Sequence, residues 1–284
     1  MPNDPSDNGP ARRRVVQWTA GAALVSWALA GQAQQRRPTD PLLLGVESLL
    51  EVSGLALHLL RAVTRETGLP VQYSIGDGAA LVSRAERGEL DVIVTQAPQA
   101  EELMERRGLV HDRRLFALGE YVIVGPGGKK GDPAHVRGLT DAAAAFARIA
   151  TAGAAGRCSF VTTGGTAGAQ AAEAALWKAV GPQPAGTWLK PGPAGPSAAL
   201  EMARELRAYT LVERGVFTAL ASRVAQGLEL LVRDDKSLAA PYHVMRAFRV
   251  NHPGGKLLVN WLTGRGGRTA LGRFGAAYRV PSLP

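Results

Sequence analysis

The chain has 284 residues, of which 46% are hydrophobic and 20% charged, a composition typical of a globular protein long enough to form two lobes. Its net charge of +9 does not indicate nucleic-acid binding, because only 6% of the residues are aromatic and the basic residues are spread along the chain. The single cysteine, Cys158, cannot form an internal disulfide and has no histidine near it in sequence, which argues against a cysteine nucleophile.

The N-terminal segment has the layout of a secretory signal peptide. Three arginines, at positions 12–14, precede an apolar run over residues 15–30, and Gly31-Gln32-Ala33 supplies the small side chains that signal peptidase accepts. The run is shorter than the roughly 20 residues needed to span a bilayer. We therefore predict that residues 1–33 are a signal peptide, with cleavage near Ala33 and a periplasmic location. Sec and twin-arginine export both stay open.

Short apolar runs alternate with helical patterns along residues 42–94. We expect strands at 42–46, 71–75 and 91–94, separated by helices at 51–67 and 80–87. Gly68 is expected to end the first of these helices. This order predicts an α/β lobe with ligand contacts at the carboxyl ends of its strands.

A second set of α/β elements follows the Gly/Pro-rich segment 125–133. The strand expected at 121–126 leads into that segment, which we interpret as a crossing between the lobes. Beyond it we expect strands at 158–161 and 208–211, and helices at 141–152, 169–180, 197–205 and 215–221. Residues 239–250 would return the chain to the first lobe, on which a helix at 256–274 would pack. The predicted fold is therefore two-lobed α/β, with lobe 1 formed by residues 34–125 and 242–284 and lobe 2 by residues 126–241.

A turn rich in threonine and glycine is the most informative motif. Residues 162–168 (TTGGTAG) follow an apolar strand and precede a helix, so that hydroxyls and backbone N–H groups gather at a helix N-terminus, where anions bind favourably. An ordinary turn with threonine caps is the alternative interpretation. Ser48 and Gly78 directly follow first-lobe strands, and strand ends from both lobes would face one cleft.

No motif indicates a metal, a cofactor or an enzyme. The five histidines are scattered without ligand spacing, neither HExxH nor paired CxxC occurs, and residues 125–130 lack Walker spacing. No nucleophile stands with a base in a recognisable pattern. We therefore expect a binding protein without a cofactor and without catalytic residues.

Blocks in sequence order resemble the tungstate-binding proteins of ABC importers, which have the type II periplasmic-binding-protein fold. The likeness covers nearly all of the mature chain. First-lobe blocks are residues 53–55, 76–81, 91–98, 112–114 and 121–126; second-lobe blocks are residues 173–177, 188, 200–203, 208–211 and 214–215. The resemblance implies that each lobe is a mixed sheet flanked by helices, with the ligand cleft between the lobes.

The resemblance also implies a function and a ligand site. It implies a monomeric protein that delivers a tungstate- or molybdate-like oxyanion to an ABC permease in the inner membrane. By position, the ligand-binding residues are Ser48, Gly78, Thr162, Thr163, Gly164, Gly165, Thr166 and Arg214.

This sequence departs from the family pattern at Thr163, which stands where the family carries an arginine. Either Arg214 or Arg113 supplies the cation instead, or the ligand is less charged. Glu47, at the edge of the cleft, would repel a dianion. A degenerate or orphan receptor that senses a different solute and signals to a membrane partner is the alternative.

Overall fold

The computed structural model describes residues 34–128, 131–164, 167–181 and 184–282. The predicted signal peptide lies outside these ranges. Within them, every helix is too short or too polar to cross a membrane.

Three parallel strands form one end of the main sheet. They are β2 (Leu42–Glu47), β3 (Val71–Gly76) and β4 (Val92–Thr95), with β2 in the middle. Antiparallel β10 (Ala239–Ala247) lies beside β4 and also pairs with the first part of β5 (Val110–Pro126). A small separate sheet pairs β1 (Gln34–Gln35) with β11 (Val250–Asn251).

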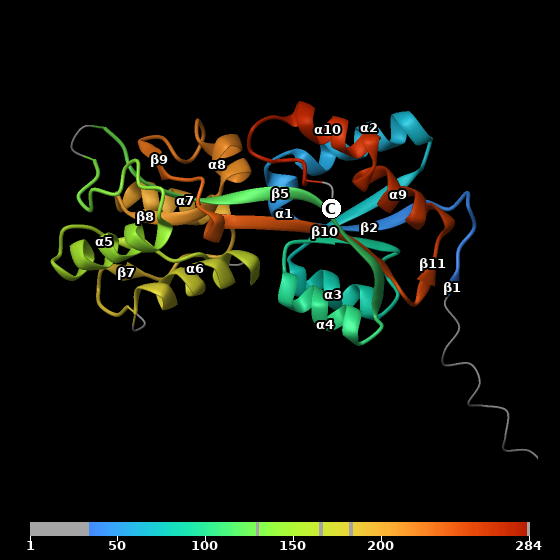
Figure 1. The fold of residues 1–284 in the computed structure, drawn as a ribbon, viewed down its shortest axis with the longest axis horizontal. Helices are drawn as coiled ribbons and strands as arrows, with labels where there is room; N and C mark the ends of the chain where they lie inside the picture. The colour runs from blue at the N-terminus through green and yellow to red at the C-terminus, as the bar shows by residue number, and fades with distance from the viewer. Residues whose placement is uncertain (1–33, 129–130, 165–166, 182–183, 283–284) are drawn as a thin grey trace, which may run out of the picture. The chain divides into compact units, whose positions relative to one another are not determined.

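Helices cover both faces of this half of the sheet. Apolar side chains of α2 (Leu55–Thr67), α9 (Pro253–Thr263) and α10 (Arg265–Phe274) pack on one face, and those of α3 (Gly78–Glu86) and α4 (Pro98–Arg106) pack on the other (Figure 1). The return of the C-terminal helices to the first lobe was predicted. Their burial on β2, β4 and β10 explains the helical spacing of Leu258 and Leu262.

The sheet continues into a second half through β5. From Tyr121 onward β5 pairs with β8 (Tyr209–Glu213) and β9 (Leu228–Val232) instead of β10. Strands β6 (Phe160–Val161) and β7 (Leu189–Lys190) extend the sheet in parallel with β8. The other chain connection is the 3₁₀ turn Lys236–Leu238, which leads directly into β10.

Four helices flank this second half. Core side chains of α5 (Ala142–Ala154) and α6 (Ala167–Val180) pack on one face, and those of α7 (Pro196–Glu205) and α8 (Arg214–Leu220) pack on the other (Figure 1). Helix α1 (Ser48–Val52), although it follows β2, contributes Leu49 to the same cluster as α7 and α8. The two halves are therefore in contact through α1.

Several predicted elements differ from the structure. The helix expected at 51–67 is two helices, because Gly54 adopts a left-handed conformation with φ of 83° between α1 and α2. The helix expected at 256–274 is likewise interrupted at Gly264, between α9 and α10. The prediction missed α4, β9 and residues 110–120 of β5, whose charged side chains around Arg113 hide the strand pattern.

Candidate functional site

The carboxyl ends of parallel strands meet on both halves of the sheet. In the first half β2 ends at Glu47 and β3 at Gly76, two residues that are paired neighbours, and β4 ends close by at Thr95. In the second half β6 and β8 run in parallel and end at Val161 and Glu213. Such ends are where open α/β sheets place their ligands.

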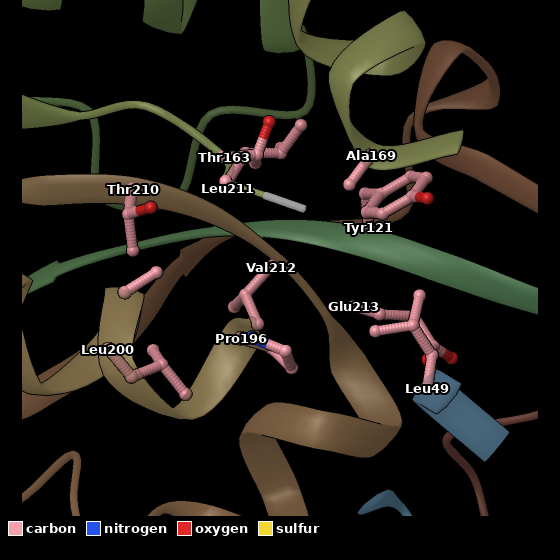
Figure 2. A pocket seen from close by; sticks show the side chains of 12 residues that line it. Leu49, Tyr121, Thr163, Ala169, Pro196, Leu200, Thr210, Leu211, Val212 and Glu213 are labelled. Atoms are coloured by element: carbon pink, nitrogen blue, oxygen red, sulfur yellow. The ribbon is translucent and has the colours of Figure 1, made fainter. Parts of the chain in front are cut away.

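A small cavity lies at the strand ends of the second half. Its volume is ≈ 30 Å³, and Leu49 of α1 closes it from the first half (Figure 2). The remaining lining residues are Tyr121, Thr163, Gly164, Ala169, Pro196, Ala199, Leu200, Thr210, Leu211, Val212 and Glu213. Most of these side chains are apolar, so the few polar atoms among them determine what the cavity can recognise.

Three buried oxygens on this lining have no direct hydrogen-bond partner among the described residues. They are the hydroxyl oxygens of Thr163 and Thr210 and the Oε1 atom of Glu213. A buried polar group without a partner costs about 1–3 kcal/mol. Their concentration in one cavity is the arrangement expected of a site that completes its hydrogen bonds with a solute or with water.

The threonine–glycine turn is held by internal hydrogen bonds. Thr162 Oγ1 accepts the Gly192 N–H at 3.0 Å, and the Thr163 N–H donates to Glu173 Oε2 at 2.5 Å. Trp177 Nε1 donates to the other oxygen of Glu173 at 3.1 Å. The Thr162 hydroxyl and the Thr163 N–H thus have protein partners, whereas the Thr163 hydroxyl has none among the described residues, and Thr163 and Gly164 both line the cavity. Gly165 and Thr166 lie outside the described residues.

On the first half, the predicted residues Ser48 and Gly78 begin α1 and α3. The carboxyl group of Glu47 lies close to Gly78, and its residue is only 3% exposed. Burial raises the pKa of Glu47 to about 7, while the nearby backbone N–H groups of Gln96 and Gly78 oppose that rise. Its Oε2 atom has no direct hydrogen-bond partner among the described residues.

A second buried carboxyl, Glu213, is a residue that the sequence analysis missed. Tyr242 donates to its Oε2 atom at 3.1 Å, and the Tyr278 hydroxyl lies 3.2 Å from the same atom. Burial, with a smaller contribution from the charge of Glu47, raises the pKa of Glu213 to about 8, although the hydrogen bonds from Tyr278 and Tyr242 oppose the rise. The available signal was its position two residues after the strand predicted at 208–211.

Neither of the two arginines considered as the missing cation lines the cavity. Arg214 Nη1 pairs with Glu120 Oε2 at 3.2 Å. Arg113 donates through Nε and Nη2 to Glu101 Oε2 at 3.1 and 3.0 Å. The site therefore offers hydroxyls, backbone N–H groups and two carboxyls. In the described ranges no group of three or more His, Cys, Asp or Glu side chains could hold a metal ion.

Gln96 joins the two halves at the end of β4. The Tyr121 hydroxyl donates to its Oε1 atom at 2.6 Å, and Gly168 in the first turn of α6 lies against its backbone oxygen. A Cβ atom on Gly168 would overlap that oxygen. Glycine is therefore required for this approach of α6 to the first half.

Comparisons with known proteins point to one family. The model of the bacterial extracellular solute-binding protein family matches residues 55–276. The chain is 26% identical over 280 residues to the tungstate-binding protein TupA of Peptoclostridium acidaminophilum, an alignment that covers 93% of this chain and 94% of the relative.

Solved structures agree with that match. The tungstate ABC transporter structure from Geobacter sulfurreducens has a TM-score of 0.73 and 26% identity, with 82% of this chain and 98% of that chain covered. The tungstate-binding protein TupA of Desulfovibrio alaskensis has a TM-score of 0.74 and 25% identity, with 86% and 100% covered.

The likeness covers both halves of the sheet and nearly the whole of each solved chain, so it extends beyond any single motif. The fold is the two-lobed, type II periplasmic-binding-protein fold, as the sequence analysis predicted. Because the family model matches most of the chain, the chain belongs to the bacterial extracellular solute-binding proteins.

Proposed function

We propose that the chain is an extracytoplasmic solute-binding protein that captures a small tetrahedral oxyanion, the class that includes tungstate and molybdate, and delivers it to the permease of an ABC importer. The observation that carries this proposal is the set of buried, unpaired oxygens at strand ends where the two halves meet. Tungstate, for which these relatives are named, supplies the chemical class. A signalling or orphan receptor is less well supported, since these relatives are binding proteins of importers.

The mature protein would act as a monomer in the periplasm, without a cofactor and without chemistry. We retain residues 34–125 with 242–284 and residues 126–241 as the proposed lobes. The sheet pairing changes at Glu120 of β5 and just before β10, a few residues ahead of these two boundaries, and rotation of one lobe on the other would bend the chain at these two connections between the halves. A ligand that contacts both lobes would favour the closed arrangement.

The proposed ligand contacts combine both lobes. The first lobe contributes Ser48 and Gly78, and the second lobe contributes Thr163 and Gly164. Thr162 shapes the turn through Gly192. Gly165 and Thr166 stay candidates from the sequence alone, and Arg214 would contribute only by exchanging its pairing with Glu120.

Thermal unfolding in the presence of oxyanions tests this function. The exported, purified protein is heated with tungstate, molybdate, sulfate or phosphate. A ligand present at 100 times its Kd stabilises the folded state by about 2.7 kcal/mol, which is readily detected as a higher Tm. No change of Tm with any of the four at millimolar concentration would contradict the proposed function.

Gly168→Ala is expected to weaken oxyanion binding at least about tenfold, because the new Cβ atom would displace α6 from Gln96 and hold the lobes apart. Isothermal titration calorimetry with the best oxyanion of the panel measures the change. Gly272→Ala in α10 is the matched control, since a Cβ atom there meets no other atom within 4 Å. Equal affinities of the two variants would show that this contact does not matter for binding.

A further inference from the structure

The carboxyl group of Glu47 stands where the first lobe would offer its N–H groups to an oxyanion. Glu47 ends β2, the middle strand of the three whose carboxyl ends meet. Its Oε2 atom lies 3.6 Å from where a Cβ atom of Gly78 would be, at the first residue of the nine-residue helix α3. The backbone N–H groups of Gly78 and Gln96 are close to it. A ligand that uses those amides must therefore contact Glu47.

One oxygen of this buried carboxyl, Oε2, has no direct hydrogen-bond partner among the described residues, although the backbone N–H groups of Gln96 and Gly78 lie close enough to lower the pKa of Glu47. Glu47 is 3% exposed. A carboxylate that only balanced an internal cation would be paired, as Glu101 is with Arg113. Helix α3 and the unpaired oxygen are two separate observations that indicate the same ligand position.

The groups around Glu47 add negative charge or hydroxyls. The titratable groups that influence it, or are influenced by it, are Asp77 at the start of α3, Glu101 on α4, Glu213 on β8, Tyr121 on β5 and Tyr242 on β10. Of these, Glu101 is paired with Arg113 and with His243 Nδ1 at 2.8 Å. Among the described residues, no cation contributes to the pKa of Glu47, so a fully ionised oxyanion would meet an ionised Glu47 with nothing there to offset the repulsion.

An ionised carboxyl group only accepts hydrogen bonds, and so does a fully ionised oxyanion. Two acceptors can contact each other only if one of them carries a hydrogen. We propose that Glu47 is a specificity-determining residue, and that the cleft holds an oxyanion only together with one hydrogen placed between the Glu47 carboxyl and a ligand oxygen. This inference rests on the proposed function and names the subclass of oxyanion within it.

Two kinds of oxyanion meet this requirement differently. Hydrogenphosphate brings its own hydrogen, which it donates to ionised Glu47. Tungstate is fully ionised at neutral pH, so Glu47 must take up a proton from solvent and donate it to the ligand. Burial is the main cause of the elevated pKa of Glu47. Because of it, protonation of Glu47 requires little free energy near pH 7 and more at each higher pH.

Titration calorimetry from pH 6.5 to 8.5 with tungstate and with phosphate tests the inference. Tungstate affinity should fall about tenfold per pH unit above pH 7, whereas phosphate affinity should stay nearly constant above that pH. The amide of Glu47→Gln donates a hydrogen bond at every pH, so in this variant the tungstate affinity should not change with pH. At pH 8.5 the variant should no longer favour phosphate over tungstate relative to the unmodified protein. Gln226→Glu, an exposed site, has no expected effect on either curve.

The outcomes separate the inference from the function on which it rests. If both oxyanions bind with the same pH dependence, or if Glu47→Gln leaves the pH dependence unchanged, the role of Glu47 is overturned. The proposed function still stands in either case. Absence of binding by either oxyanion at all pH values overturns both. The two curves of the unmodified protein decide the point even if the variant fails to fold.

Discussion

Raising the pH from 5 to 8 is expected to lower the free energy of unfolding, and Glu213→Gln is expected to remove about half of this loss. Burial raises the pKa of Glu213 to about 8 and that of Glu47 to about 7, both from 4.5. The folded protein therefore keeps two protons that the unfolded chain releases above pH 4.5. The stabilisation they give is complete below that pH and is lost as the pH rises through the folded pKa values.

Each of these protons lowers the free energy of unfolding by about 1.4 kcal/mol per pH unit as the pH rises from 4.5 to the pKa of its group in the folded protein. Urea unfolding at intervals of half a pH unit measures the slope. Of these two carboxyls, only Glu213 still holds its proton between pH 7 and 8. Glu213→Gln should therefore flatten the dependence of the unfolding free energy on pH in that range, whereas Glu47→Gln should not. A slope between pH 7 and 8 that survives in Glu213→Gln would show that the carboxyl is ionised in the folded state.

Trp177→Ala is expected to destabilise the protein by about 3–5 kcal/mol, a large fraction of the stability of a domain. Trp177 is only 2% exposed and packs against Phe146, with ring centres 4.3 Å apart, against Phe160 at 5.2 Å and against Trp188 at 6.0 Å. Removal of the indole leaves a cavity that these neighbours can fill only in part. Urea unfolding measures the loss.

The same side chain links the core to the ligand turn. Its Nε1 atom donates to Glu173, which in turn accepts the Thr163 N–H. Trp177→Phe should keep most of the packing and lose that hydrogen bond, for a smaller loss of about 1–3 kcal/mol. Trp261→Ala in α9 is the matched control, because Trp261 is half-buried and its indole bonds to exposed Glu66. Equal losses from the Trp177 and Trp261 alanine variants would contradict this account.

Local patterns determined most of the α/β alternation. Buried strands such as 92–95 are apolar runs bounded by polar residues, and Gly68 ends α2 in the left-handed conformation that glycine favours. The errors arose where neighbouring residues hid the pattern. Gly54 divides a helix without disturbing its apolar spacing, and the charged residues of β5 around Arg113 look like a loop until their partner Glu101 is known.

The candidate site was predictable only as a location. The positions after β2, β3 and β6 follow from the order of strands and helices, and for this reason Ser48, Gly78 and the turn at Thr163 were identified. Which polar atoms remain free there depends on contacts between segments far apart in sequence. Thr162 is bound by Gly192 and Arg214 by Glu120, whereas the Thr163 hydroxyl has no partner among the described residues.

Hydrophobic periodicity and glycine placement act over a few residues, so the sequence by itself determined the α/β alternation, and its resemblance to the tungstate-binding proteins supplied the two-lobed fold of a solute-binding protein. The tertiary structure alone decided the electrostatics of the cleft. The charge of a buried group depends on its desolvation and on partners brought from other elements. Here those partners are tyrosines and backbone amides around Glu47 and Glu213, while both predicted cations pair with carboxylates elsewhere.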